Sequence, residues 1–173
     1  NGLTLTGKGT IDNSAAASTA VAAAASDVHE HKSLIHVTGA IAIDGVTLIN
    51  DPEHHWHGNS YNSAAIAYWN DANITIRNAR IISGEFTVCG MGRDVASGEI
   101  TLTDSYFEST SSNKDNGQHW AYAMRLYGSK VRIDNCEVKG IQGGVSIESC
   151  QDAVISGGKY YTVNTPGAKD AFY

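Results

Sequence analysis

Six of the seven histidines in this chain fall in three polar segments, which also hold two of its three tryptophans. The segments contain His29 and His31, then His54, His55, Trp56, His57, Asn59 and Tyr61, and finally His119, Trp120 and Tyr122. Indole and phenol rings stack on the apolar face of a pyranose, while imidazole and amide groups bond its hydroxyls. These residue types predict a carbohydrate-binding site formed by Trp56, Trp120, Tyr61, Tyr122, Asn59 and His119.

The same histidines allow two other interpretations. Imidazole ligates zinc, copper or nickel, but His54, His55 and His57 lie too close together for helical ligand spacing. They would bind an ion only if their loop folded around it. In the other interpretation, the histidines are solvated loop residues that cover strand ends. We therefore expect no resident cofactor, with a calcium or transition-metal ion as the alternative.

The elements that position these segments are read from an internal repeat. Residues 66–76, 124–133 and 145–155 align with one another as a strand, a polar corner and a second strand. Five copies then share a corner residue followed by a small residue. Four of the corner residues are Asn78, Asp104, Asn135 and Gly157, and the five small residues are Val46, Ala79, Ser105, Cys136 and Gly158.

Within each copy, apolar residues alternate with polar ones, so one face of each strand is expected to be buried. Successive copies are 22 to 33 residues apart, which is too irregular for ankyrin or tetratricopeptide repeats. The sequence predicts an all-β, right-handed parallel β-helix of about five to six turns, with Ile76, Leu102, Ile133 and Ile155 in one inward column. The alternative is an antiparallel sandwich, whose strands need not share a corner.

We expect residues 1–173 to form a single β-helix unit, a fragment of a longer chain. An alanine-rich stretch predicts a short helix near residues 14–26, with Ser14 as its N-cap. No capping pattern follows Tyr160. An open β-helix end exposes apolar core, so we expect an oligomer or a further domain to cover it.

Charge excludes several partners. The chain carries a net charge of −6 with no lysine or arginine cluster, which argues against nucleic acid and anionic membranes. No apolar run approaches the roughly 20 residues that span a bilayer, so no membrane insertion is expected. The three cysteines, Cys89, Cys136 and Cys150, form no CxxC pair and so do not indicate a zinc site.

The hexapeptide from Gly7 to Asp12, with the repeat that follows it from Ile35 to Tyr160, resembles the polygalacturonase and pectate-lyase-like superfamily of right-handed β-helices. The repeat is also similar to bacterial surface adhesins and phage tailspikes, so the resemblance implies a fold rather than an activity. The hydrolase motifs Asn-Thr-Asp, Asp-Asp, Gly-His-Gly and Arg-Ile-Lys are missing. Lyases of this superfamily use arginine or lysine as a base, often with calcium, which makes Arg125 a candidate on the outer strand face.

The function expected from these observations is a non-catalytic, glycan-binding or adhesive β-helix of a bacterial surface protein or phage receptor-binding fibre. Its partner would be a polysaccharide or cell-surface glycan, and its location secreted, on the cell surface or on the virion surface. The alternative is a polysaccharide lyase or glycoside hydrolase with a catalytic centre near His57, His119 and Arg125. A structural spacer that binds no glycan is the third hypothesis.

Overall fold

The computed structural model describes residues 2–12, 33–50, 64–69, 71–84, 86–91, 97–110, 122–141 and 143–163. These residues form strands and turns, and none of them is helical. The helix predicted near residues 14–26 lies outside the described residues. Among the described residues, no helix has the length and apolar character needed to cross a membrane.

The strands form three sheets, which we call A, B and C, and every strand pair within them is parallel. Sheet A contains β1 (Gly2–Thr6), β4 (Ala40–Asp44), β7 (Asn73–Arg77), β10 (Glu99–Thr103), β13 (Lys130–Asp134) and β16 (Asp152–Ser156). Sheet B contains β2 (Thr10–Asp12), β5 (Thr47–Asn50), β8 (Arg80–Ser83), β11 (Tyr106–Ser109), β14 (Glu137–Gly140) and β17 (Lys159–Thr162). Sheet C contains β3 (Ile35–Val37), β6 (Ala64–Tyr68), β9 (Phe86–Gly90), β12 (Tyr122–Tyr127) and β15 (Gly143–Glu148).

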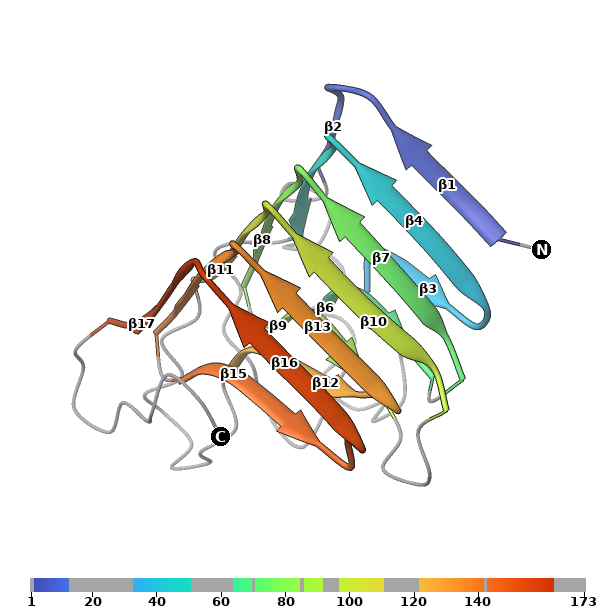
Figure 1. Cartoon of the computed structure of the whole chain (residues 1–173). Coiled ribbons are helices and arrows are strands. Elements are labelled where there is room, and N and C mark those ends of the chain that lie inside the picture. Colours follow the sequence, from blue (N-terminus) through green and yellow to red (C-terminus); the bar gives the residue numbers. More distant parts are fainter. Residues whose placement is uncertain are drawn as a thin grey trace, which may run out of the picture.

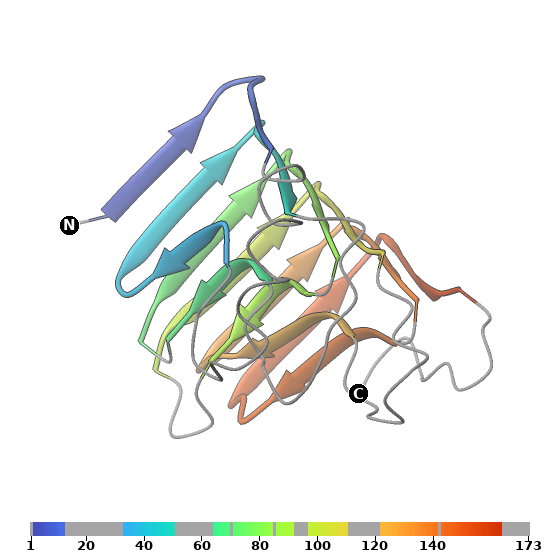
Figure 2. The same ribbon diagram turned by 180° about the vertical axis from the view of Figure 1, so that it is seen from behind.

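The chain is a right-handed parallel β-helix of about six coils. Each coil passes through sheet A, then sheet B, then sheet C, and the next coil repeats the path one strand further along (Figure 1). The view from behind shows the strands of sheet C stacked in the same order as those of sheet A (Figure 2). The predicted fold is therefore confirmed, and the parallel pairing excludes the antiparallel sandwich.

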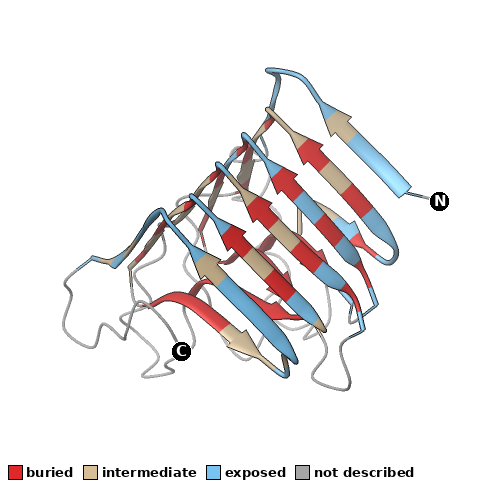
Figure 3. Cartoon of the chain, viewed as in Figure 1, coloured by how far each residue is buried: buried red, intermediate tan, exposed pale blue. Residues whose placement is uncertain are grey.

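The predicted inward column is present in sheet A. Leu102 pairs with Ile76 on one side and with Ile133 on the other, and Ile133 pairs with Ile155. Ile43 pairs with Ile76 and extends the column toward the N-terminus. Buried and exposed bands alternate along β4, β7, β10 and β13, whereas β1 and β16 at the two ends are mostly exposed (Figure 3).

The corners between sheets A and B follow the predicted pattern. Asn78, Asp104 and Asn135 adopt left-handed backbone conformations with φ of 50°, 48° and 49°. Asparagine and aspartate tolerate this conformation better than other non-glycine residues because their short side chains bond locally. The Asn78 amide donates to the Asp44 carboxylate at 2.9 Å, and the Asn135 amide donates to the Asp104 carboxylate at 2.7 Å. The first bond joins the Asn78 corner to the last residue of β4, and the second joins the Asn135 corner to the equivalent corner residue of the preceding coil.

In four of the five copies, the residue after the corner is small because it occupies a narrow buried position, whereas Gly158 in the last coil is exposed. Val46, Ala79, Ser105 and Cys136 are all buried. Burial raises the pKa of the Cys136 thiol, which keeps it protonated and favours a packing role.

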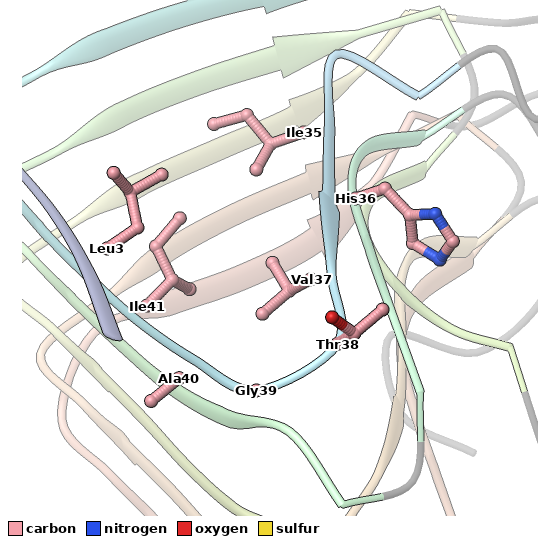
Figure 4. A pocket seen from close by; sticks show the side chains of 8 residues that line it. All are labelled: Leu3, Ile35, His36, Val37, Thr38, Gly39, Ala40 and Ile41. Carbon is pink, nitrogen blue, oxygen red and sulfur yellow. The ribbon is translucent and has the colours of Figure 1, made fainter. Parts of the chain in front are cut away.

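At the N-terminal end, the space inside the first coil is open. A hollow of about 210 Å³ is lined by residues of β1, β3 and β4 and of the turn between β3 and β4. Leu3, Ile35, Val37 and Ile41 point into it, so among the described residues it is the open end of the apolar core (Figure 4).

Leu102→Ala should lower the free energy of unfolding by about 3 kcal/mol, because it opens a cavity between two occupied positions of the inward column. Thr101→Ala, one residue away on the outer face, should change it by less than about 0.5 kcal/mol. Urea denaturation of the two variants measures both values. Equal losses would contradict the inward column.

Candidate ligand-binding face on sheet C

The segments rich in histidine connect sheet B to sheet C. Residues 13–32 link β2 to the chain before β3, residues 51–63 link β5 to β6, and residues 111–121 follow the end of β11 and precede β12. All three therefore begin and end at the same corner of the solenoid, as the repeat predicts. The side chains themselves lie outside the described residues: His54, His55, Trp56, His57, Asn59, Tyr61, His119 and Trp120.

The three central strands of sheet C are buried on both faces, unlike those of sheet A, whereas His36 of β3 is exposed. All described residues of β6, β9 and β12 are buried, whereas sheet A alternates. Met124 and Leu126 belong to the central core, as predicted. Ala67 and Cys89 belong instead to a second apolar cluster on the outer side of the sheet.

Tyr122, one of the predicted carbohydrate-binding residues, lies in this second cluster with Phe86. Its ring lies against Gly143, where an added Cβ would come within 2.4 Å of the ring carbon Cδ1. Tyr122 is buried, so its ring contributes to packing on the outer side of sheet C.

Arg125 lies on the outer side of sheet C, but it is buried rather than solvated. Its Nε–H donates to Glu148 Oε1 at 2.9 Å, and its Nη2 donates to Oε2 at 3.2 Å. The hydroxyls of Ser146 and Tyr127 donate to the same two oxygens at 2.9 and 3.1 Å. The Glu148 carboxylate thus accepts four hydrogen bonds, which fills its acceptor sites.

This pairing sets the charge of both groups. Burial alone would raise the pKa of Glu148, but hydrogen bonds from Arg125, Ser146 and Tyr127, with the arginine charge, outweigh it and lower the pKa. Burial would lower the pKa of Arg125, and the Glu148 carboxylate outweighs that effect, so the pKa is raised. Near neutral pH, Glu148 therefore has no proton to donate, and Arg125 cannot accept one.

A buried tyrosine supports this network from the inside of the solenoid. The Tyr68 hydroxyl donates to the Tyr127 carbonyl at 3.0 Å and accepts from the Tyr127 N–H at 2.7 Å. Gly90, on the intervening strand, leaves room for this contact. A Cβ there would lie 2.4 Å from Tyr127 Cδ2 and 3.0 Å from the Tyr68 hydroxyl.

An exposed aromatic group lies at the end of β6. Trp69 is 42% exposed, and its ring centroid lies 6.4 Å from that of His36, with the planes tilted by 44°. His36 is turned away from the core hollow (Figure 4). Asp71 is exposed in the turn that follows, where the Ala72 N–H donates to the Trp69 carbonyl at 2.9 Å.

This group pairs an indole with an imidazole, and the carboxylate of Asp71 follows two residues after the indole in the chain. An indole offers a flat apolar face, and the other two offer hydrogen-bonding groups, which are the requirements for binding a sugar ring. Within the described ranges, no three histidine, cysteine or carboxylate side chains are grouped closely enough to hold a metal ion. The predicted ligands His54, His55 and His57 lie outside those ranges.

Sequence reasoning missed both the Arg125–Glu148 pair and the Trp69 group. The signal for the pair was present, because the repeat alignment places Met124 beside Val145, as the structure does. Glu148 then follows as a diagonal neighbour of Arg125. Trp69 and His36 were overlooked because they lie in strand segments rather than in the histidine-rich loops.

Comparisons of the chain with protein-family models, with curated proteins and with solved structures found no match. The parallel sheets confirm the β-helix architecture that the sequence predicts, and the resemblance to the polygalacturonase and pectate-lyase-like superfamily stays a prediction.

Glu148→Gln should lower the free energy of unfolding by about 2 kcal/mol near pH 7, because it leaves a buried guanidinium without its counter-charge. The value is below that for a fully buried pair because the Glu148 side chain is 22% exposed. The pKa of Glu148 in the folded protein lies below its ordinary value of 4.5. The ion pair therefore stabilises the fold fully above pH 4.5, and this contribution is lost as the pH falls through the pKa of the folded state.

Urea denaturation at about pH 7 and at the lowest pH at which the parent still folds should therefore show the variant and the parent converging in acid. Glu99→Gln is the matched control, because Glu99 pairs with Lys130 at the surface, with 57% and 51% of the two side chains exposed. It should cost less than about 1 kcal/mol at both pH values. A loss for Glu148→Gln that is the same at both would contradict the account.

Proposed function

We propose that this chain is a non-catalytic, glycan-binding parallel β-helix, with Trp69, His36 and Asp71 forming part of the contact surface. The proposal combines this group with the carbohydrate-binding residues predicted in the loops, Trp56, Asn59, Tyr61, His119 and Trp120. Trp69 lies at the far end of β6 from the segment 51–63, about 17 Å away along a five-residue strand. Both positions belong to the sheet C side of the solenoid.

The exposure of Trp69 carries the proposal. Among the described residues, the other large apolar side chains with comparable exposure are Leu3, Ile11, Val154, Tyr161 and Val163. All five lie in the first or last coil, and Leu3 and Ile11 among them are on the inward face that the first coil leaves open. Trp69 lies in the second coil, so an exposed indole there supports a binding role.

The Arg125–Glu148 pair favours binding over catalysis. A lyase base must lose its proton, and a glycosidase acid must hold one until the substrate is bound. Near neutral pH, Arg125 keeps its proton and Glu148 has lost its own, which is the reverse of what these two roles require. The two side chains are also hydrogen-bonded to each other. The Arg125–Glu148 pair is therefore neutral overall and stabilises sheet C rather than transferring protons.

The wider setting of this proposal comes from the sequence. A glycan-binding β-helix suits a secreted protein, a bacterial cell surface or a phage receptor-binding fibre. Within the pectate-lyase-like superfamily, which the repeat resembles, the chain would be a member that keeps the scaffold without the hydrolase motifs.

Trp69→Ala should weaken binding to a recognised polysaccharide by about tenfold or more, because it removes the stacking surface. A panel of soluble polysaccharides and isothermal titration calorimetry would identify the ligand and measure the loss. Tyr161→Ala is the matched control, since Tyr161 is similarly exposed but lies on sheet B. Its affinity should equal that of the parent.

The same panel distinguishes the alternative. Release of oligosaccharides that disappears in His119→Ala would contradict a non-catalytic role and favour a lyase or hydrolase. Equal binding by the parent and Trp69→Ala would exclude Trp69 from the site.

A further inference from the structure

The charges around the proposed site bear on which class of glycan it accepts. An acidic polysaccharide, built from uronic acids, presents a carboxylate on many of its rings. A site for such a polymer needs cations that are free to pair with those carboxylates. An uncharged polysaccharide needs only stacking surfaces and hydrogen-bonding groups.

Most cations of the described residues are already paired with carboxylates. Salt bridges join Arg77 to Asp44, Arg80 and Lys139 to Glu108, Arg125 to Glu148, Lys130 to Glu99, and Arg132 to Asp152. The two remaining described cations are Lys8, between β1 and β2, and Lys159, in β17. Neither belongs to sheet C.

Within sheet C itself, the described lysine, arginine and carboxylate side chains are Arg125 and Glu148, which neutralise each other. The charged group closest in sequence to Trp69 among the described residues is Asp71, an exposed carboxylate. Asp71 would repel an approaching uronate and would accept hydrogen bonds from an uncharged sugar.

The three connecting segments between sheets B and C are also acidic in sequence, and they join sheet C at the opposite end of its strands from Trp69. Segments 13–32, 51–63 and 111–121 contain the carboxylates Asp27, Glu30, Asp51, Glu53 and Asp115. Against these five they contain two lysines, Lys32 and Lys114. With neutral histidines, the segments carry a net charge of −3, in keeping with −6 for the whole chain.

We propose that the glycan bound at Trp69 is uncharged, so that the site selects neutral polysaccharides and rejects polyuronates near neutral pH. This inference rests on the proposed glycan-binding function and names its ligand class. The inference also excludes an acidic polysaccharide as the ligand, because neither sheet C nor its connecting segments supply a net positive charge.

The test uses matched polymers that differ in charge alone. Several polyuronates are compared with their own carboxyl-reduced forms, in which each carboxylate has become a neutral hydroxymethyl group, by calorimetry near neutral pH and at low salt. At least one reduced polymer should bind at least about tenfold more tightly than its parent polyuronate. Added salt should narrow this difference, because it screens the repulsion.

A charge-matched pair of variants locates the effect. Asp71→Asn and Thr75→Lys both raise the net charge by one, but Thr75 lies exposed on the outer face of sheet A. Asp71→Asn should improve polyuronate binding severalfold, and Thr75→Lys should leave it nearly unchanged. Trp69→Ala should weaken binding of the reduced polymer by about tenfold or more, because it removes the stacking surface.

The outcomes separate the two proposals. Tighter binding of the polyuronates, weakened by salt, would overturn the neutral-glycan inference and leave glycan binding intact. Absence of binding to every charged and reduced polymer, and to the neutral polysaccharides of the wider panel, would overturn the proposed function itself and this inference with it.

Discussion

The in-register stacking of parallel coils is the constraint on which the rest of the structure depends. Each strand forms its hydrogen-bond ladder with the equivalent strand one coil away, so equivalent residues lie directly above one another. Side chains at equivalent positions of neighbouring coils must therefore be compatible in size and polarity. The isoleucine and leucine column of sheet A, the asparagine and aspartate corners and the small residues behind them all result from this requirement.

Stacking also explains why sheet C can hold a buried charge. Ala67, Cys89, Arg125 and Ser146 share one outward column, so the arginine has small neighbours along the sheet. Its guanidinium can then extend to Glu148, which lies one coil further along and two residues along the strand. The bidentate geometry and two additional hydroxyl donors offset the cost of taking both charges out of water.

The part of the fold that repeats was predictable from the sequence. Alternation identified the strands, and the shared corners at Asn78, Asp104 and Asn135 identified the coil, because the strands of a sandwich need not share a corner. The common corner of the histidine-rich segments followed from the same register. The structure confirms these features at the predicted residues.

Features that occur in a single coil were harder to predict from the sequence. The outward position of Arg125 was predicted, but its burial was not, because a single sequence does not reveal that sheet C is covered on both faces. Trp69 occupies the same register position as Tyr127 and Glu148, and nothing in the pattern distinguishes an exposed indole from a packed one. Exposure depends on what neighbouring segments cover, which is a tertiary property.

Distances between spin labels along the outer face of sheet A test the stacking most directly. Thr4, Arg132 and Val154 belong to one outward row of the sheet, so label pairs can be placed in the first and fifth coils and in the first and sixth. Cys150 is replaced by serine, because Cys89 and Cys136 are buried whereas Cys150 is partly exposed. Four and five strand spacings predict separations near 19 Å and 24 Å, about 4.8 Å apart. Equal separations, or a shorter distance for the Val154 pair, would contradict the coil order.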